Sequence, residues 1–473
     1  MNKTTTGLMA AKRVAVAVAT VCATLAAPAY ATDDVKNVLD LMLKKGVISQ
    51  QDYDQFMKDN ADAAENKQFK EQRLDKDISK ANAFIQKNAE AGQVMKNGLG
   101  IQSADGKYSV QFIGRVHMDY RSFSQDSTAA DTDTDKFDYR RARFGIRGKL
   151  TNDFEYMLFA NVTDGSTIAS SQTVLDEGYL TYVGFKPAQV RLGKFKMPFG
   201  LEQLTSSNNI DFMERSISGI EGEFIPAKQQ GAMLFGSPMS GFSYAAALSV
   251  GANKSATIDK PEFIGRVSAN FAELMGNKDV VTHLGMGYSV GEISTLGTAI
   301  SGNHEGRATT KPFTSVTITG PADRTRQNLE LALAYNAFKL QGEYFDFKYD
   351  QASGTELGAK GMYVQGMWNI TGENHNYSNS SGTFGWIKPK SEFSTSKGGT
   401  GAWQAGLRFS KIDGSDGFGA ANKNKADSMT VGLNWIANSN VRFMLNYVVT
   451  DYAVAISGVS KDKALNLRAQ VSF

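Results

Sequence analysis

The chain has 473 residues, of which 51 are basic and 48 acidic, with one cysteine and a mean hydropathy of −0.31. Residues 1–31 hold three basic and no acidic residues, so the remainder balances 48 basic against 48 acidic residues. A nucleic-acid-binding protein needs a net basic footprint, and this balance argues against one. Any attraction for anions therefore has to come from where the charges are placed.

The N-terminus has the features of a secretory signal peptide. A basic start is followed by an apolar stretch over residues 14–27 and by the A-x-A cleavage site Ala29-Tyr30-Ala31. We expect residues 1–31 to be removed together with Cys22, which would leave no disulfide and no thiolate metal site. No later stretch approaches the roughly 20 apolar residues of a transmembrane helix, so a membrane-spanning chain would have to form a closed barrel.

Residues 32–95 are predicted to be helical and periplasmic. Apolar residues in the first part recur at the spacing of one helix face, and Gly46 is expected to end this helix. Ser49 and Asp52 have the spacing of a capping box, which predicts the start of a second, short helix.

The polar stretch that follows contains a weak heptad pattern. Leu74, Ile78, Ala81 and Ile85 step by 4, 3 and 4 residues, as the core positions of a coiled coil do. A solvated helical linker would show the same short pattern. A coiled coil would imply an oligomer with its helices in the periplasm, and such helices could also tether the cell wall.

Residues 107–473 are predicted to form an all-β, 16-stranded antiparallel outer-membrane barrel. The last run, 464–473, alternates apolar with polar residues and ends on Phe473. One apolar face and a terminal aromatic are typical of the final strand of such a barrel, although the edge strand of a soluble sandwich also alternates. The predicted strands are 107–120, 137–150, 154–163, 174–183, 188–196, 229–236, 242–250, 263–271, 280–290, 326–337, 338–349, 361–370, 402–412, 427–437, 441–451 and 464–473.

Strand parity predicts on which side each connection lies. With both chain ends in the periplasm, the connections after strands 6, 8, 10 and 14 are periplasmic and short, whereas most external connections are longer, as in bacterial barrels. The long stretch 371–401 is an exception, because parity places it in the periplasm. The strands around Asp176 and Asp346 alternate poorly, and we expect bulges or shifted boundaries there.

The connection 197–228 is the third external loop and is expected to fold into the lumen. A loop of this length is usually functional or disordered, and its high apolar content argues against disorder. The inner barrel wall is the nearest surface that could bury its apolar side chains, so the loop would narrow the pore. The residues predicted to form the constriction are Phe199, Glu202, Ser206, Ser207, Phe212 and Glu214.

The predicted strand 137–150 is the strongest candidate for an anion path. Arg141, Arg143, Arg147 and Lys149 occupy one face, and apolar residues occupy the other. A basic side chain facing lipid at the midplane costs about 2–4 kcal/mol, so the basic face is expected to line the lumen. Arginine suits phosphate because its planar fork donates two hydrogen bonds at once.

Further basic residues extend this path. Arg115 falls on the inner face of the first strand, whereas Arg140 points outward unless a bulge intervenes. Lys194 and Lys196 lie where the long loop begins, and Arg215 is the loop's own cation. The predicted anion-binding residues are Arg115, Arg140, Arg141, Arg143, Arg147, Lys194, Lys196 and Arg215. Alternatively, inner arginines could pair with inner carboxylates and tie the loop to the wall.

Several sequence motifs, most of them in or near the long loop, resemble those of a known family. They are Gly193-Lys194-Phe195-Lys196-Met197-Pro198-Phe199-Gly200-Leu201-Glu202, Ser206-Ser207-Asn208, Phe212-Met213-Glu214-Arg215-Ser216, the arginine-rich run 137–144, and the runs 45–49, 371–373 and 401–403. They resemble the signature of the phosphate-selective porins O and P. The resemblance implies a homotrimeric sixteen-stranded porin in outer-membrane lipid that takes up phosphate or related small anions and needs no cofactor.

An enzyme is the first competing interpretation. The four histidines, His117, His283, His304 and His375, stand in no metal-binding or nucleophile motif spacing. We therefore predict neither catalytic residues nor a metal site.

A less selective channel is the second competing interpretation. The first external loop is acidic, with Asp126, Asp131, Asp133 and Asp135. These charges would oppose anion capture at the mouth. A channel for pyrophosphate or organic acids therefore remains an alternative to a phosphate channel.

Overall fold

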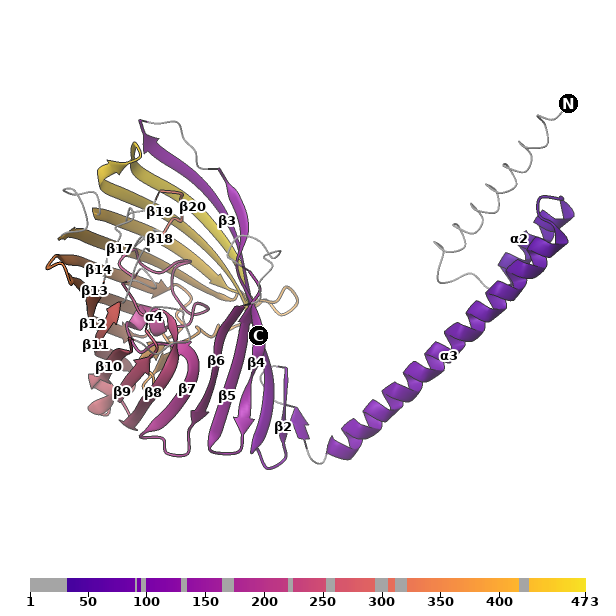
Figure 1. Cartoon of the computed structure of the whole chain (residues 1–473), viewed down its shortest axis with the longest axis horizontal. Coiled ribbons are helices and arrows are strands. Elements are labelled where there is room, and N and C mark those ends of the chain that lie inside the picture. The colour runs from indigo at the N-terminus through magenta and orange to yellow at the C-terminus, as the bar shows by residue number, and fades with distance from the viewer. Residues whose placement is uncertain are drawn as a thin grey trace. The chain divides into compact units, whose positions relative to one another are not determined.

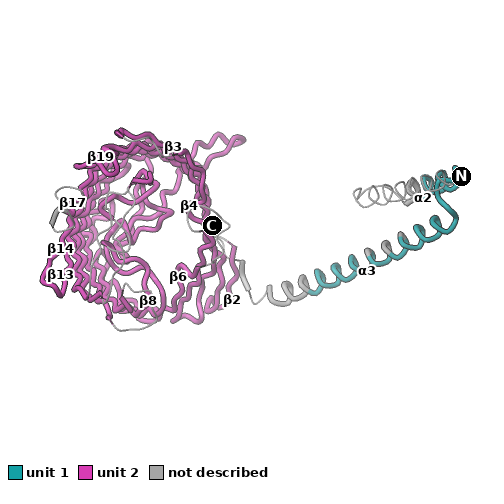
Figure 2. The backbone as a smooth tube through the Cα atoms, turned by 45° about the horizontal axis from the view of Figure 1, so that its top comes forward, with its two compact units in different colours: residues 1–91 teal, residues 92–473 magenta. Residues whose placement is uncertain are grey.

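The computed structural model describes residues 32–89, 92–94, 99–128, 134–163, 174–219, 224–251, 260–293, 305–310, 321–416 and 425–473. The chain divides into two compact units, residues 1–91 and 92–473, which Figure 2 distinguishes by colour. The predicted signal peptide lies outside the described residues, as do Asp131, Asp133 and His304.

The first unit contains helices α2 (Thr32–Lys44) and α3 (Gln50–Ala89). The predicted capping box is confirmed, because the Asp52 N–H donates to Ser49 Oγ at 3.2 Å and the Ser49 N–H donates to the Asp52 carboxylate at 3.1 Å. The expectation that the second helix is short is wrong, since α3 has 40 residues. Its polar sequence holds neither glycine nor proline and is rich in strong helix formers, so nothing interrupts the helix.

Neither helix is a candidate for crossing a membrane. Among the helices that the structure describes, none is both long enough and apolar enough to do so. Leu74 and Ile78 are exposed on α3 within the single chain. The coiled coil therefore stays a prediction.

Sixteen strands of the second unit close into an antiparallel barrel (Figure 1), which confirms the predicted fold class. The barrel closes where β20 pairs with β3, up to the pair Ser472↔Arg115. The strands are β3 (Tyr108–Ser127), β4 (Lys136–Leu150), β5 (Phe154–Asn161), β6 (Val174–Tyr182), β7 (Gln189–Lys196), β8 (Lys228–Met239), β9 (Phe242–Ser249), β10 (Glu262–Asn270), β11 (Val280–Ile293), β12 (Ala322–Tyr335), β13 (Phe338–Gln351), β14 (Glu356–Asn369), β17 (Ala402–Asp416), β18 (Lys425–Ile436), β19 (Val441–Ile456) and β20 (Val459–Ser472).

The two faces of the wall follow the period-two pattern of the sequence. On β12, Leu329, Leu331 and Leu333 are exposed on the outer face, whereas the alternating Asn328 and Glu330 are buried on the inner face. An outer apolar face suits lipid, and an inner polar face suits a lumen. The alternation thus separates the side chains that meet the membrane from those that can line a pore.

The C-terminus seals the barrel at β3. The backbone of Phe473 exchanges two hydrogen bonds with Gly114, at 2.9 and 3.0 Å. Its ring lies over Gly114, where an added Cβ would be 2.3 Å from a ring atom. Below this point β2 (Gly100–Ser103) pairs with β3 and with β1 (Gly92–Val94).

The two expected irregularities have different outcomes. The bulge at Asp176 is confirmed, because the pairing of β5 with β6 shifts register between Phe159 and Ala160 and leaves Asp176 as the extra residue. The prediction of an irregularity at Asp346 is wrong, since β13 pairs continuously with both neighbouring strands. Its inner face is aromatic because a loop inside the barrel covers it, and this hides the usual contrast between the faces.

The segment 370–401 lies at the end of the barrel that holds the short connections, as parity predicts. The Phe393 N–H donates to the Ala437 carbonyl at 2.7 Å, next to the short turn before β19. The segment includes β15 (Tyr377–Ser378) and β16 (Thr383–Phe384). It reaches the inner wall, where Arg266 Nη1 donates to the Ser381 carbonyl at 2.9 Å.

Candidate functional site

The connection between β7 and β8, residues 197–227, is named loop L3 here, and it lies inside the barrel. Its one-turn helix α4 (Leu201–Leu204) is visible within the ring of strands in Figure 1. The backbone N–H groups of Leu201 and Glu202 donate to the Glu343 carboxylate on β13, at 2.7 and 2.8 Å. These contacts fix the start of L3 to the wall.

Apolar side chains near both ends of L3 also pack against β13. Phe199 stacks on Phe345 with ring centroids 6.5 Å apart, and Phe224 packs on Phe347 at 4.7 Å. All four rings are buried. Burial of a phenylalanine side chain stabilises by about 1.5–3 kcal/mol, so these contacts offset the entropy lost on ordering the loop.

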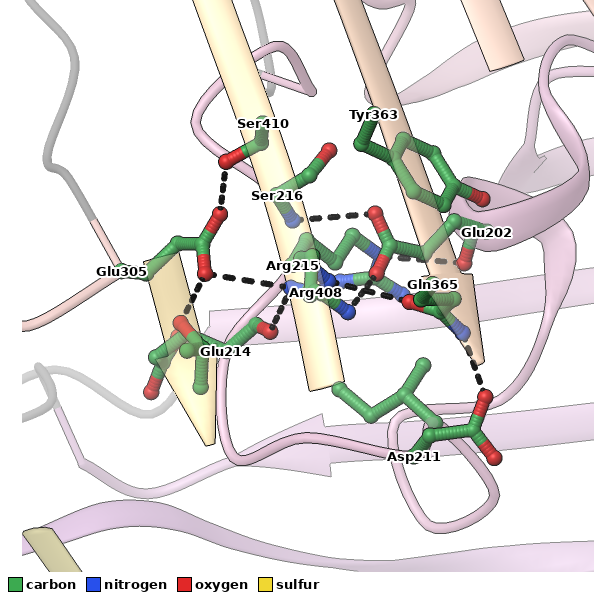
Figure 3. A network of polar contacts seen from close by, with 12 residues as sticks. Glu202, Asp211, Glu214, Arg215, Ser216, Glu305, Tyr363, Gln365, Arg408 and Ser410 are labelled. Atoms are coloured by element: carbon green, nitrogen blue, oxygen red, sulfur yellow. Dashed lines mark hydrogen bonds and ion pairs between the residues drawn. The ribbon is translucent and has the colours of Figure 1, made fainter. Parts of the chain in front are cut away.

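Arg408 on β17 is the centre of a polar network that anchors L3 (Figure 3). Its Nη2 donates to the Glu202 carboxylate at 2.6 Å, and its Nη1 donates to the Glu214 carbonyl at 3.0 Å. The guanidinium also lies 4.5 Å from the centroid of the Phe212 ring. This arginine therefore holds three residues of the loop at once.

Residues 305–310, from the connection between β11 and β12, join the same network. Glu305 accepts from the Ile217 N–H at 3.1 Å and bonds Ser410 and Thr430 on the wall. It also forms an ion pair with Arg408 at 3.6 Å. Figure 3 shows Glu305 and Glu202 near this arginine.

Other arginines of the inner wall are neutralised in the same way. Arg266 binds Glu330 at 2.7 Å, and Arg324 and Arg326 both bind Glu262. These side chains are all buried. On this side of the barrel the alternative interpretation holds, because the arginines pair with carboxylates and stabilise the wall.

Arg140 is turned inward by a bulge. The pairing of β3 with β4 shifts register between His117 and Met118, which leaves Arg140 as the extra residue of β4. Its Nε and Nη2 donate to the two carboxylate oxygens of Glu214 at 2.8 and 3.0 Å. The sequence analysis expected Arg140 to point outward unless a bulge intervened, and the bulge is present.

Glu214 is surrounded by three further guanidinium groups. Arg468 lies 3.0 Å from its carboxylate, Arg121 3.4 Å and Arg307 3.9 Å. Burial alone would raise the pKa of the Glu214 carboxyl, but the charges of Arg140, Arg307 and Arg468 hold it well below its usual value. The pKa of Arg307 is lowered to about 10 by burial and by the neighbouring charge of Arg140.

Arg115 and Arg141 differ from these residues because no described carboxylate forms an ion pair with either. Arg115 Nη1 donates to Ser207 Oγ of L3 at 2.8 Å, and its guanidinium lies over the Phe159 ring at 5.0 Å. Arg141 is buried, and its guanidinium lies 3.5 Å from His117 Nδ1. Neither guanidinium, one on β3 and one on β4, therefore has an ion-pair partner among the described carboxylates.

Arg143 and Arg147 continue this basic face. Arg143 lies opposite Arg115 in the strand register, donates to Asn161 at 3.2 Å and binds Asp176 at 2.9 Å. Arg147 donates to Gln111 at 2.8 Å and is exposed. Arg115, Arg141, Arg143 and Arg147 thus share one face, and among the described residues only Arg143 of these four has a carboxylate partner.

The remaining predicted cations lie elsewhere. Lys196 Nζ donates to the Gln203 carbonyl at 2.7 Å, and Arg215 donates to the Gln203 and Thr205 carbonyls at 3.2 Å, so both shape the turn after α4. Lys194 donates to the Leu175 carbonyl at 2.7 Å. Each of these three side chains thus donates to a backbone carbonyl of L3 or of β6.

The predicted constriction residues are all part of the ordered loop. Ser207 is bound by Arg115, and Ser206 Oγ accepts from the Asn208 N–H at 3.4 Å. Asn208 Oδ1 in turn lies 3.1 Å from His117 Nε2. This part of L3 therefore meets the basic face across the lumen.

The sequence interpretation missed His117, Arg121 and Arg307 as members of the site. Strict alternation from Arg115 would have placed His117, Asp119 and Arg121 on the inner face of β3, so a signal for two of the three was present. Arg307 lies in a loop with no periodicity. Its left-handed backbone, at φ 60°, is set by the fold and leaves no trace in the sequence.

Together these features define a class of protein. A closed barrel of sixteen antiparallel strands, an inward loop and an arginine face inside the lumen are the parts of an outer-membrane porin. The acidic first loop is partly neutralised in the described residues, because Asp126 binds Lys463 at 2.8 Å.

Comparison with known proteins identifies the family. The model of the family "Phosphate-selective porin O and P" matches residues 110–473, and the chain belongs to this family. Porin O of Pseudomonas aeruginosa is 26% identical over 384 residues, which cover 75% of this chain and 85% of that relative. Family and fold thus indicate an outer-membrane anion channel rather than an enzyme.

Solved structures share the fold at low sequence identity. OmpT of Vibrio cholerae matches with a TM-score of 0.50 and 12% identity, over 77% of this chain and 98% of that chain. An anion-selective porin from Comamonas acidovorans matches with a TM-score of 0.50 and 14% identity, over 78% of this chain and all of that chain.

Proposed function

We propose that this channel takes up phosphate or related small oxyanions by passive diffusion, along the arginine face of β3 and β4. The observation that carries the proposal is the pair Arg115 and Arg141, which lie on the inner face of the wall with no carboxylate ion-pair partner among the described residues. A guanidinium away from water without a counter-charge is costly. A passing anion would supply the missing charge.

The spacing of the arginines suits conduction rather than tight capture. Arg141, Arg143 and Arg147 follow one face of β4, about 6.6 Å apart for each two residues of strand. Conduction requires several weak sites, so that an ion can leave each one. Arginine also favours a tetrahedral oxyanion over chloride, because its fork donates to two oxygens at once.

Reversal potentials in a planar bilayer under a KCl gradient test the proposal. We expect a strongly anion-selective value, and added phosphate should reduce the chloride current. A cation-selective or non-selective channel would contradict the proposed function. Inhibition by pyrophosphate or an organic acid at lower concentrations than by phosphate would favour the less selective channel instead.

Substitution of the basic face locates the path. Arg141→Gln combined with Arg143→Gln should lower both the anion selectivity and the inhibition by phosphate. Lys278→Gln, which removes an exposed charge at the short turn before β11, is the matched control and should change neither. Unchanged currents in the double variant would move the path to another part of the lumen.

We further propose that the protein assembles as a homotrimer through the side of the barrel formed by β5, β6 and β7. These strands have 8, 9 and 8 residues, whereas β11 to β14 have 14 each. Eight residues tilted by about 45° span about 19 Å, less than the apolar band of about 25 Å. Neighbouring subunits would shield this low side from lipid, and native mass spectrometry in mild detergent would test the stoichiometry.

A further inference from the structure

The carboxylate of Glu214 occupies a position that is built like an oxyanion site. Four guanidinium groups from four parts of the chain converge on it: Arg121 from β3, Arg140 from β4, Arg468 from β20 and Arg307 from the connection between β11 and β12. Arginines that surround a pair of oxygens are how proteins bind phosphate and carboxylate alike. Here the ligand is a side chain of L3.

Among the described residues, two of the four arginines have no ion-pair partner besides Glu214. Within the described part of the chain, the ion pair of Arg140 and its side-chain hydrogen bonds all go to this carboxylate, and Arg307 has no other ion pair there. Arg121 and Arg468, in contrast, are also held by Asp119. Removal of the Glu214 charge would therefore leave Arg140 and Arg307 without a partner while the other two stayed in place.

The two dependent arginines are also the accessible ones. The side chains of Arg140 and Arg307 are 19% and 26% exposed, whereas those of Arg121 and Arg468 are 2% and 0% exposed. An anion that arrives through the lumen would therefore reach Arg140 and Arg307 first. Arg141, which forms no ion pair with a described carboxylate, follows Arg140 directly in β4 and leads on to the basic face.

We propose that the arginines around Glu214 form a further oxyanion site of the channel, and that the Glu214 carboxylate is its tethered occupant. A phosphate in transit exchanges with this carboxylate at Arg140 and Arg307 and then passes to Arg141. A tethered competitor acts at a high effective concentration, so it weakens the site and lets the ion leave. The inference rests on the proposed function, because it assigns a further anion-binding site to the same path.

The substitution Glu214→Gln removes the competing charge and keeps the shape of the side chain. In bilayers that contain the full-length protein, we expect the phosphate concentration that halves the chloride current to fall by about tenfold, because phosphate no longer displaces a carboxylate. Arg140→Gln in the Glu214→Gln background should reverse this gain. Asp211→Asn is the matched control, since it also converts a buried L3 carboxylate, one that binds Lys339 and Gln365, and it should leave the phosphate inhibition unchanged.

The possible outcomes separate this inference from the proposed function. A wild-type channel without anion selectivity would remove both. A selective wild-type channel whose phosphate inhibition is unchanged or weaker in Glu214→Gln would overturn only the tethered occupant and leave Glu214 as an anchor of L3. If Glu214→Gln fails to assemble, Glu214→Asp, which withdraws the carboxylate by one methylene, should show a smaller gain in the same direction, and no gain would overturn the inference.

Discussion

Arg140 and Glu214 join a bulge of the barrel wall to the middle of L3 through two parallel hydrogen bonds of 2.8 and 3.0 Å. The bulge gives Arg140 an inward direction that its parity would deny it. The loop supplies the carboxylate. This contact therefore adds to the anchoring of the loop and places a carboxylate beside Arg140, the residue that precedes Arg141.

The contact between Arg140 and Glu214 predicts that the anion selectivity of the channel does not change in mild acid. The pKa of Glu214 in the folded protein is held well below its ordinary value, which in unfolded chains is about 4.3. A lowered pKa means that the contribution is fully present above the unfolded value and is lost only as the pH falls through the folded value. We therefore expect the reversal potential in KCl to be the same at pH 7 and about pH 5. A loss of anion selectivity between these values would show that another group controls it.

The anchoring of L3 by Arg408 gives a second prediction. Arg408→Gln leaves the buried Glu202 carboxylate without its cation, and the loss of one partner of a buried pair costs about 3–5 kcal/mol. We expect L3 to detach in part, so that single-channel conductance rises and anion selectivity falls. Arg408→Lys keeps the charge but not the fork, and it should give an intermediate conductance.

Unchanged conductance in Arg408→Gln would mean that the aromatic contacts of Phe199 and Phe224 are enough to hold the loop. Conductance that rises equally in Arg408→Lys and Arg408→Gln would show that the geometry of the fork matters more than the charge.

Period-two alternation was enough to predict the barrel. It located all sixteen strands, because a wall between lipid and lumen imposes opposite chemistry on alternate residues. It failed at β13, where Phe345 and Phe347 face inward. The lumen there is filled by the aromatic residues of L3, and a loop that is distant in sequence changed what the inner face prefers.

The residues of the site could be predicted from the sequence only where they lie on one face of a regular strand. Arg141, Arg143 and Arg147 share a face because β4 is regular below its bulge. The pairing of each arginine is a tertiary property, and alternation carries no information about it. Arg468 and Arg141 both fall on inner faces, yet one has two carboxylate partners and the other has none among the described residues.

That difference predicts opposite effects on stability. Arg468→Gln leaves Asp119 with Arg121 as its remaining partner and should lower the free energy of unfolding by about 3–5 kcal/mol. Arg141→Gln removes a buried charge that forms no ion pair with a described carboxylate, so it should leave the stability unchanged or raise it. Urea unfolding followed by tryptophan fluorescence in micelles measures both. Equal destabilisation by the two variants would show that Arg141 has a structural role like that of Arg468.

The seal between Phe473 and Gly114 gives the last prediction. A methyl group on Gly114 would lie 2.3 Å from the Phe473 ring, so Gly114→Ala should displace the ring and cost about 1–3 kcal/mol. Gly366→Ala is the matched control, because an added Cβ there meets no atom within 4 Å. The heat-dependent shift in gel mobility of the folded barrel measures both.

A double variant separates the ring from other causes. If the clash with the ring is the reason for the loss, Gly114→Ala should cost much less in a Phe473→Ala background than in the wild type, because contacting residues give non-additive effects. Additive losses would place the cost in the backbone of β3 instead. In that case the two hydrogen bonds between Phe473 and Gly114, rather than the ring, would close the barrel.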